Sequence, residues 1–311
     1  MSVASILETA WRARPATREP RRVFHGPGEG SGRLEDLFID VFGDHAWVTW
    51  KGAGHLETNR AIASFLESKG LQSAVVQEKP GDDLATLAGP LFGAPPERFV
   101  CEEHGLKYEI RLSGTRHPGL FLDHAPLRAW LTKNFGGASV LNTFCYTGSL
   151  SVAAAAARPG VKITNLDLSK PAIEWSRQNW LLNGHREEDG DFIYGDVFEW
   201  LPKLDKRGRK FDCVLVDPPS SSHGKKGHFS TKKNLKELAV LAMTLVAPGG
   251  LLMVSINSYN VSWAEFEKSL ATASQETGFK GRELARIGQD ETYYPVRRPE
   301  DRYLKGLLLQ S

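Results

Sequence analysis

The spacing of apolar and polar residues changes near residue 125. Before this point the apolar residues come in short runs: residues 37–50 predict two strands around a Gly-Asp turn, and residues 73–79 predict another strand. Residues 59–70 carry apolar side chains at helical spacing and end on a glycine, as an amphipathic helix does. Residues 99–112 predict a hairpin around His-Gly. We therefore expect a small α+β domain over residues 31–120.

Beyond residue 125, strands and helices alternate. Helices are predicted at residues 125–135, 149–157, 171–184, 197–204 and 231–246, and strands at residues 139–144, 161–168, 191–196, 211–216 and 249–257. A last helix at 263–278 and strands at 280–289 and 301–310 would complete the sheet. Such alternation implies a mainly parallel sheet with helices on both faces. The expected fold class is α/β, a Rossmann-like, doubly wound, seven-stranded sheet over residues 121–311.

The amino-acid composition indicates the class of protein but not the reaction that it catalyses. The 311 residues are 41% hydrophobic and 24% charged, which is typical of a soluble globular protein. No apolar run approaches the ~20 residues that cross a bilayer, and the first residues lack the apolar core of a signal peptide, so we expect a cytoplasmic protein. Three scattered cysteines, Cys101, Cys145 and Cys213, predict neither disulfides nor a zinc site.

Positive charge is unevenly distributed, although the net charge of +2 is too small to indicate a nucleic-acid partner by itself. Residues 1–30 are rich in Arg, Pro and Gly, and we expect them to form an extended basic arm. The basic residues fall in this arm, in residues 225–236 and near the C-terminus: Arg12, Arg14, Arg18, Arg21, Arg22, Lys225, Lys226, Lys232, Lys233, Lys236, Arg297, Arg298, Arg302 and Lys305.

The loops that follow the predicted strands are where a ligand is expected, because open α/β sheets bind ligands outside the carboxyl ends of their strands. After the first strand, Gly148 opens a helix whose free N–H groups favour a carboxylate. Asp167 ends the second strand, where it can accept hydrogen bonds from both hydroxyls of a ribose. Asp196 follows the third strand and can accept from an adenine amino group. Taken singly, these residues are also consistent with an ordinary loop and with helix caps.

Two features separate this site from a dinucleotide site and locate the chemistry. A pyrophosphate needs a loop with several glycines, whereas the first loop here has one glycine beside the bulky Phe144 and Tyr146. The fourth strand ends in Asp217-Pro218-Pro219, a stiff turn that can aim the carboxylate at a planar acceptor.

These segments resemble a known family. Residues 140–156, 165–184, 194–201 and 211–219 look like motifs I to IV of class I S-adenosylmethionine-dependent methyltransferases, particularly the large-subunit ribosomal RNA methyltransferase I/K family. Residues 117–128 and 289–309 resemble further elements of that family. The resemblance implies the following S-adenosyl-L-methionine contacts: Asp123, Arg128, Phe144, Tyr146, Gly148, Asp167, Leu168, Asp196, Val197 and Asp217. It also implies that Asp217, Pro218 and Pro219 face the methyl acceptor.

The chain departs from the family pattern in two places. Full-length members begin with an RNA-binding PUA domain, for which the first ~30 residues leave no room. Members that methylate cytosine C5 carry a nucleophilic cysteine after the fifth strand, where this chain reads VSINSYN. Since carbon attack needs a thiolate, and Cys145 and Cys213 are expected to be packing residues, we predict methylation of a nucleobase nitrogen in ribosomal RNA.

Other interpretations stay open at this stage. A methyltransferase of a small molecule or a protein would share the cofactor half, and a non-catalytic binding protein would retain the fold. Lys225, Lys226, Lys232 and Lys233 are candidate contacts to RNA phosphates, with a solvated surface as the alternative. Phe229 and Tyr259 could stack on a base or simply pack, and His223 and His228 lack the partners of a metal site.

Overall fold

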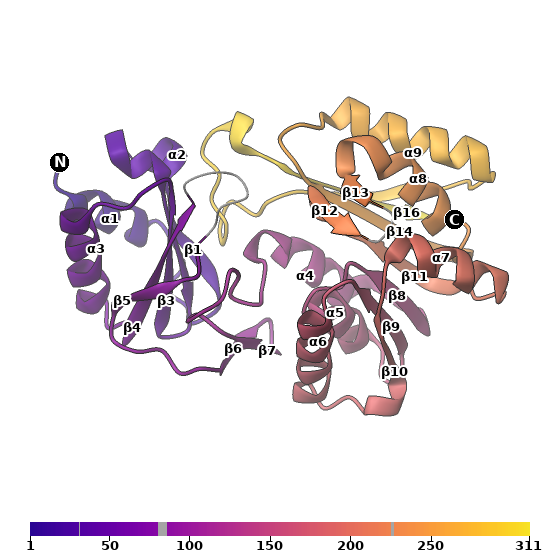
Figure 1. Ribbon diagram of the computed structural model, residues 1–311, viewed down its shortest axis with the longest axis horizontal. Coiled ribbons are helices and arrows are strands. Elements are labelled where there is room, and N and C mark those ends of the chain that lie inside the picture. The colour runs from indigo at the N-terminus through magenta and orange to yellow at the C-terminus, as the bar shows by residue number, and fades with distance from the viewer. Residues whose placement is uncertain (31, 80–85, 225–226) are drawn as a thin grey trace. The chain divides into compact units, whose positions relative to one another are not determined.

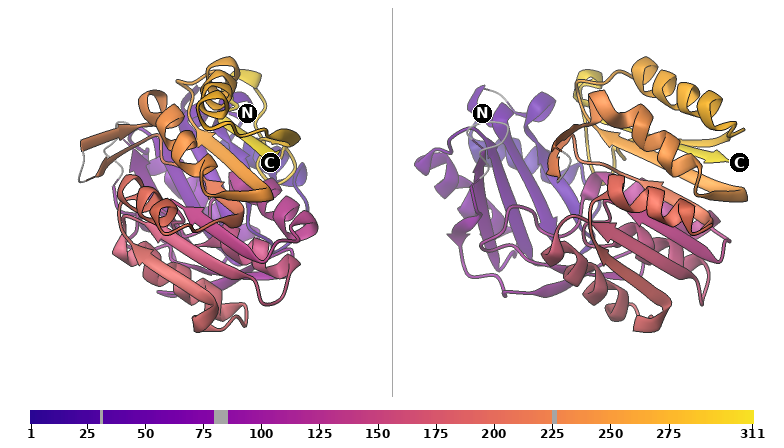
Figure 2. Two further views of the ribbon diagram at one scale, coloured as in Figure 1. Left: turned by 90° about the vertical axis from the view of Figure 1, so that its right-hand side faces the viewer. Right: turned by 45° about the vertical axis from the view of Figure 1, so that its right-hand side comes forward.

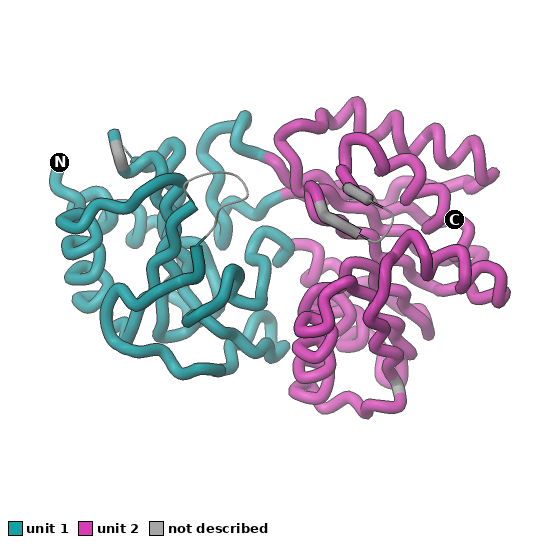
Figure 3. Tube along the Cα trace, in the orientation of Figure 1, with its two compact units in different colours: residues 1–125, 289–302 teal, residues 126–288, 303–311 magenta. Residues whose placement is uncertain are grey.

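The computed structural model describes residues 1–30, 32–79, 86–224 and 227–311. The chain forms two compact units (Figure 3). Unit 1 comprises Met1–Ala125 and Gln289–Arg302, and unit 2 comprises Pro126–Gly288 and Tyr303–Ser311. The chain therefore passes between the units after residues 125, 288 and 302.

Unit 1 is built on a five-stranded sheet with the order β1-β2-β3-β4-β5. Its strands are β1 (Arg21–His25), β2 (Leu37–Phe42), β3 (His45–Lys51), β4 (Ser73–Lys79) and β5 (Gly89–Phe92). β3 and β4 are parallel and are joined through helix α3 (Leu56–Ser68), while the other neighbours are antiparallel. A separate hairpin consists of β6 (Phe99–Glu103) and β7 (Leu106–Ile110). The predicted strands and hairpin of this region are confirmed.

The expected extended arm is wrong, because residues 1–30 fold into unit 1. Helix α1 (Val3–Arg12) is capped by the Ser2 hydroxyl, which accepts from Ser5 N, and it buries Ile6, Leu7 and Ala10. β1 then joins the edge of the sheet, and α2 (Gly26–Glu29) and the 3-10 helix η1 (Gly32–Asp36) follow. The Arg and Pro content obscured three apolar positions that share one helical face.

Unit 2 is a doubly wound α/β fold on a seven-stranded sheet, as predicted. The strand order is β10-β9-β8-β11-β14-β16-β15. The strands are β8 (Ser139–Thr143), β9 (Lys162–Asp167), β10 (Gly190–Tyr194), β11 (Phe211–Val216), β14 (Val246–Asn257), β15 (Arg282–Ile287) and β16 (Leu304–Gln310). All neighbours are parallel except β16, which runs antiparallel to both β14 and β15.

Helices cover both faces of this sheet (Figures 1 and 2). They are α4 (Ala125–Asn134), α5 (Ser149–Ala157), α6 (Lys170–Leu182), α7 (Val197–Lys206), α8 (Thr231–Met243) and α9 (Trp263–Thr277). α5 packs against α6, and α8 packs against both α7 and α9. Leu141, Val214 and Leu252 of the central strands are fully buried, which explains why these strands are almost continuously apolar.

One hairpin of unit 2 was not predicted. The segment after Asp217-Pro218-Pro219 forms a small antiparallel hairpin of β12 (Ser221–Gly224) and β13 (Gly227–Ser230), which leads directly into α8. Lys225 and Lys226 lie outside the described residues. Within the described ranges, no helix is long and apolar enough to span a lipid bilayer.

Candidate active site

The candidate site lies at the carboxyl edge of the sheet in unit 2. β8 and β11 are neighbours at the centre of this sheet, and the strand order proceeds outward from them in opposite directions. Such a reversal leaves a crevice between the loops that follow the two central strands. Residues 144–148 follow β8, and Asp217 follows β11.

The loop after β8 has an unusual backbone. Phe144 (φ 53°), Tyr146 (φ 49°) and Gly148 (φ 74°) are all in the left-handed region, which is sparsely populated for residues other than glycine. The loop is held by hydrogen bonds from Cys145 N to Leu166 O (3.1 Å) and from Gly148 N to Cys145 O (2.8 Å). Strain of this kind persists where the surrounding structure enforces it, and such residues cluster at ligand sites.

Gly148 is required for a reason that the sequence indicated only in part. A Cβ atom at this position would lie 2.9 Å from Ser176 Cβ on α6, so the glycine permits a close approach between the loop and that helix. Gly148 is also the N-cap of α5, and within the described part of the chain no side-chain hydrogen bond caps this helix end. The first N–H groups of α5 therefore remain available to a carboxylate, which the helix dipole also favours.

Asp167 at the end of β9 does not cap the following helix. The Ser169 hydroxyl fills that role by accepting from Ala172 N. The Asp167 carboxylate instead accepts hydrogen bonds from Tyr146 N (2.9 Å) and Ser169 N (2.8 Å), so it connects the loops after β8 and β9. Burial raises the pKa of Asp167, and the backbone hydrogen bonds partly offset this shift. Leu168 beside it is half-buried.

Asp196 follows β10 and caps the next helix, which is the alternative role that the sequence allowed for it. Its Oδ1 accepts from Phe198 N at 2.9 Å, which fixes the start of α7. Asp196 and the adjacent Val197 are both buried. Capping uses one carboxylate oxygen, and within the described residues no hydrogen bond involves the other. The capping role is thus compatible with a second role toward a ligand.

The turn after β11 is fixed by neighbouring elements. Ser255 on β14, itself buried, donates its hydroxyl to Asp217 Oδ1 at 2.5 Å. Thr231 at the start of α8 donates to Pro219 O through its hydroxyl (2.8 Å) and to Ser220 O through its N–H (3.1 Å). Pro218 is buried and Pro219 is exposed. The Asp217 carboxylate is therefore held in place at the strand end rather than on a mobile loop.

Sequence reasoning missed the polar residues that support these loops from below. Asn142 on β8 donates to Ser151 Oγ on α5 (2.9 Å), and Ser151 donates to Asn165 Oδ1 on β9 (2.6 Å). All three side chains are almost fully buried. Asn179 on α6 also donates to Thr147 O at 2.9 Å. A polar residue inside an otherwise apolar strand, as in VLNTF and ITNLD, was the available signal.

The two remaining predicted cofactor contacts, Asp123 and Arg128, lie outside the loops that follow the strands. Asp123 lies in the 3-10 helix η2 (Leu122–His124) of unit 1, where its Oδ1 is 3.1 Å from His124 Nδ1. Arg128 lies on α4 in unit 2 and is 1% exposed. The role of both residues toward the cofactor stays a prediction.

The cysteines are packing residues, as expected. Cys145 and Cys213 are buried, and burial raises the pKa of both thiols far above the range in which a thiolate forms at neutral pH. Burial also raises the pKa of Cys101, to about 12. Among the described residues, no group of three or more His, Cys, Asp or Glu side chains is placed to hold a metal ion.

The residues predicted to stack on a base or to contact RNA phosphates differ in their exposure. Phe229 is buried and its ring lies 5.9 Å from that of Phe144 and 5.7 Å from that of Phe198, so it packs against the loop after β8. Tyr259, by contrast, is 55% exposed. Lys232 and Lys233 are exposed on α8. Lys236 is also exposed and pairs with Glu276 at 2.8 Å.

The residues present fit a cofactor that carries a ribose and a free amino acid end but no phosphate. The open N-terminus of α5 suits a carboxylate, and the Asp167 carboxylate suits ribose hydroxyls. The half-buried rings of Phe144 and Tyr146 leave a loop without the multiple glycines that a pyrophosphate requires.

Comparison with known proteins points to a family that uses a cofactor of this kind. The family model of S-adenosylmethionine-dependent methyltransferases matches residues 21–276. Ribosomal RNA large subunit methyltransferase I of Photobacterium profundum is 33% identical over 285 residues, which cover 88% of this chain and 70% of that protein. The protein of the same name from Klebsiella pneumoniae is 30% identical over 307 residues, or 96% of this chain and 75% of that protein.

A solved structure extends the likeness to the whole fold. SMU.776, crystallised with SAH, has a TM-score of 0.86 to this chain at 22% sequence identity, with 100% of this chain and 82% of that one covered. At this identity the likeness shows the fold.

Proposed function

Because the chain belongs to the S-adenosylmethionine-dependent methyltransferase family, we propose that it methylates a nitrogen atom of a nucleobase in ribosomal RNA. The observation that carries this proposal is the Asp217-Pro218-Pro219 turn. It is anchored by Ser255 and Thr231 at the central crevice, beside the strained loop that follows β8.

The cofactor contacts are assigned to the loops after β8, β9 and β10. In this assignment the N-terminus of α5 binds the carboxylate of the cofactor, Asp167 binds its ribose, and Asp196 binds its adenine amino group. Phe144, Tyr146, Leu168 and Val197 surround these groups. When bound, S-adenosyl-L-methionine supplies an electrophilic methyl group on its sulfonium sulfur.

The protein's part in the chemistry is mainly alignment. Asp217, oriented by Ser255, accepts a hydrogen bond from an N–H of the nucleobase and takes up the proton that this nitrogen loses. Pro218 and Pro219 stiffen the turn, and the planar base lies against it. A nitrogen acceptor is favoured because it attacks with its own lone pair, whereas a carbon acceptor needs a reactive thiolate and both buried thiols of unit 2 have raised pKa values.

The ribosomal RNA assignment rests on the names of the two relatives and on exposed positive charge. Both relatives are named as large-subunit ribosomal RNA methyltransferases. Lys232 and Lys233 at the start of α8 are exposed and follow the Asp217 turn closely in the chain, so they are assigned to RNA phosphates. A ribosomal substrate would place the enzyme in the cytoplasm.

The test is a search for the methylated nucleoside. Ribosomal RNA from cells that lack the protein should miss one methylated nucleoside that normal cells contain, as measured by mass spectrometry after complete digestion. Purified protein with S-adenosyl-L-methionine should restore the same nucleoside on that RNA. If neither assay reveals a methylated nucleoside, RNA is not the substrate. A methyl group found on a ring carbon would reject the nitrogen assignment alone.

A further inference from the structure

Unit 1 contains a hollow of about 460 Å³ between helix α1 and strand β1. All of its lining residues come from one short stretch of chain: Trp11, Arg12, Arg14, Pro15, Ala16, Thr17, Arg18 and Arg21. Four of these eight residues are arginines and none is acidic. We call this hollow the Trp11–Arg21 pocket. It is separate from every residue assigned to the cofactor, and its volume is within the range of small-ligand sites.

The two inner arginines of the pocket have unused hydrogen-bond donors. Arg14 is 7% exposed and Arg21 is 5% exposed, and the Nε–H group of each is buried without a hydrogen-bond partner among the residues that the structure describes. Arg21 donates through Nη1 to Thr17 O at 2.5 Å and to Glu19 O at 3.3 Å. Buried guanidinium donors normally find acceptors, because a buried unpaired donor is costly. Both guanidinium groups therefore retain capacity for an additional acceptor.

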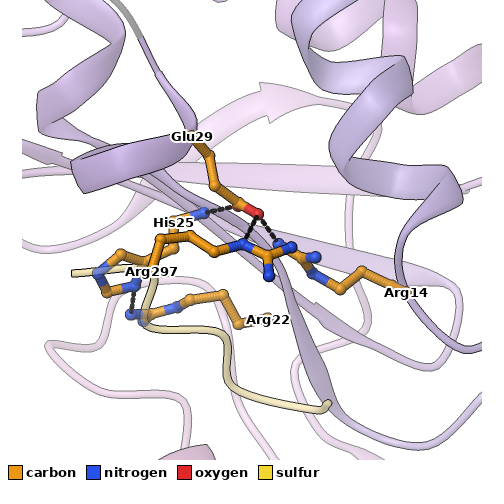
Figure 4. Close-up of polar contacts among 5 residues, drawn as sticks. All are labelled: Arg14, Arg22, His25, Glu29 and Arg297. Carbon is orange, nitrogen blue, oxygen red and sulfur yellow. Dashed lines mark hydrogen bonds and ion pairs between the residues drawn. The ribbon is translucent and has the colours of Figure 1, made fainter. Parts of the chain in front are cut away.

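Glu29, the buried carboxylate that pairs with Arg14, is shared with a second arginine, so it does not fully neutralise Arg14. Glu29 accepts hydrogen bonds from Arg14, from Arg297 Nε at 3.1 Å and from His25 N at 2.9 Å (Figure 4). Glu29 thus divides one negative charge between two guanidinium groups. Arg21 forms no ion pair with any carboxylate of the described residues.

The outer arginines add to this positive charge. Arg12 pairs with Glu8 at 2.7 Å, but Glu8 is shared with Lys69 at 2.5 Å. Arg18 pairs with Asp44, and its side chain is 79% exposed. Such exposed pairs are weak and can exchange one anionic partner for another.

The pocket also has a fixed shape. Trp11 packs edgewise against Phe65 of α3, with ring centroids 6.1 Å apart, and the Arg21 guanidinium carbon lies 5.5 Å from the centroid of the Trp11 ring. These contacts hold the inner guanidinium before any ligand binds, which lowers the entropic cost of binding. Burial lowers the pKa of Arg21, because water is largely excluded and no carboxylate compensates the charge.

We propose that the Trp11–Arg21 pocket binds a phosphate group of the RNA backbone, so that unit 1 holds the RNA that unit 2 methylates. A phosphodiester offers the acceptor oxygens and negative charge that the unused guanidinium donors lack, and arginine matches its geometry in a bidentate manner. This inference rests on the proposed RNA substrate. It concerns backbone binding only and assigns no sequence specificity to the pocket.

The test separates binding from chemistry by using Arg21→Gln, with Arg98→Gln as the matched control. Arg98 belongs to the same unit, is exposed and lies outside the pocket, so its loss removes the same charge from the same body. For Arg21→Gln we expect the KM for ribosomal RNA to rise about tenfold or more, since hydrogen bonds to charged groups are the strong ones. The kcat and the affinity for S-adenosyl-L-methionine should remain those of the wild type.

The salt dependence of RNA binding distinguishes a phosphate contact of Arg21 from a purely structural role, which would leave that dependence unchanged. In a plot of the logarithm of the association constant for RNA against the logarithm of the salt concentration, the steepness of the slope should decrease by about one in Arg21→Gln, because one phosphate contact is lost. A folded Arg21→Gln protein with the wild-type KM and slope overturns the proposal. The same holds if Arg98→Gln has an equal effect on both quantities.

Two further measurements cover other outcomes. Should Arg21→Gln fail to fold, the double variant Arg12→Gln/Arg18→Gln removes only exposed side chains and should raise the KM in the same direction. Ultraviolet cross-linking of wild-type protein to RNA should attach the RNA to the peptide that contains Trp11. Protection of this peptide by millimolar inorganic phosphate as complete as that by RNA would identify a small-anion site and overturn the RNA assignment.

The pocket and the proposed function fail in different ways. If the wild type methylates no RNA, the proposed function is rejected whatever the pocket binds. If the wild type methylates RNA while the pocket variants retain its KM and salt slope, the pocket alone is rejected.

Discussion

The crevice of unit 2 and the Trp11–Arg21 pocket of unit 1 use opposite means to present polar groups. The crevice presents short side chains, Asp167 and Asp217, on strand ends, together with a backbone forced into the left-handed region at Phe144 and Tyr146. The pocket presents long guanidinium side chains from a segment between two elements. One site is acidic and fixed by backbone geometry, and the other is basic and depends on side-chain reach.

This difference indicates what each region can recognise. Short carboxylates held by backbone N–H groups and a serine hydroxyl allow little adjustment, which suits a single small cofactor with hydroxyl groups at fixed positions. Arginines that share their carboxylate partners can adjust to phosphates along a variable chain. The predictions below ask whether chemistry, cofactor binding and acid response divide between the two units in this way.

The largest effect is expected at the acceptor turn. Asp217→Ala should lower kcat roughly 100- to 1,000-fold, the usual cost of losing a positioned polar group at a reacting centre. Its affinity for S-adenosyl-L-methionine, measured by calorimetry, should fall much less than kcat, because the main cofactor contacts are assigned to the loops after β8, β9 and β10.

Two variants serve as controls for Asp217→Ala. Ser255→Ala keeps the carboxylate but removes the hydrogen bond that orients it, and it should lower kcat by less. Asp205→Ala, on the exposed face of α7, should have wild-type kcat. An active Asp217→Ala enzyme would refute the role assigned to this carboxylate.

A smaller effect is expected at the ribose contact. Asp167→Asn should weaken the binding of S-adenosyl-L-methionine roughly 10- to 100-fold, since one charged hydrogen-bonding partner contributes about 1.5–3 kcal/mol. RNA binding, measured by filter retention, should not change. Asp191→Asn, near the opposite end of β10, is the matched control. Weakened RNA binding in Asp167→Asn would contradict the division between the two regions.

The pH dependence of cofactor binding sharpens this result. Burial raises the pKa of Asp167, so this carboxylate takes up its proton at a higher pH than an ordinary aspartate does. The protonated form has lost the charge that strengthens its bonds to ribose hydroxyls. The wild-type affinity for S-adenosyl-L-methionine should therefore fall as the pH drops through this raised pKa, whereas the affinity of Asp167→Asn should stay nearly constant.

The smallest effect, counted per pH unit, concerns the stability of unit 1 in acid. Burial and the charges of Arg22, Lys51 and Arg14 lower the pKa of His25 from 6.5 to about 3. On acidification the unfolded chain takes up the proton first, so the free energy of unfolding should fall between about pH 6.5 and pH 3. The slope contributed by this histidine is at most about 1.4 kcal/mol per pH unit.

Hydrogen exchange of β1 to β4 measures this slope in unit 1 alone. His25→Phe should remove the contribution of His25 and leave a shallower slope. His55→Gln, which replaces an exposed histidine of the same unit, should retain the wild-type slope. An unchanged slope in His25→Phe would show that the buried imidazole does not resist protonation.

The sequence predicted unit 2 well because its signals are local. Each strand is a short apolar run, each helix has its own periodicity, and the candidate site residues follow strand ends, so alternation placed Gly148, Asp167 and Asp217 on the loops after the strands. The supporting residues depend on which elements become neighbours. Ser255 reaches Asp217 only because β14 pairs with β11, a register that no short segment encodes.

Unit 1 was harder to predict for the same reason. The helix at Val3–Arg12 has only three buried apolar residues and is followed by a stretch rich in arginine and proline, and its packing partner α3 begins more than forty residues later in the chain. The return of Gln289–Arg302 to this unit left no local trace, since the ion pair between Glu29 and Arg297 joins residues far apart in sequence. Composition indicated an extended arm, and long-range packing produced a helix and a strand.

The position of β16 in the sheet affects how the chain can mature during synthesis. Leu304–Gln310 lies between β14 and β15, and β15 has no other neighbour in the sheet. Leu304–Gln310 must therefore emerge from the translating ribosome before the growing chain can complete this sheet. Until then β15 is an unpaired edge that chaperones or aggregation can capture, so deletion of Leu304–Gln310 would leave a nascent protein exposed to proteolysis.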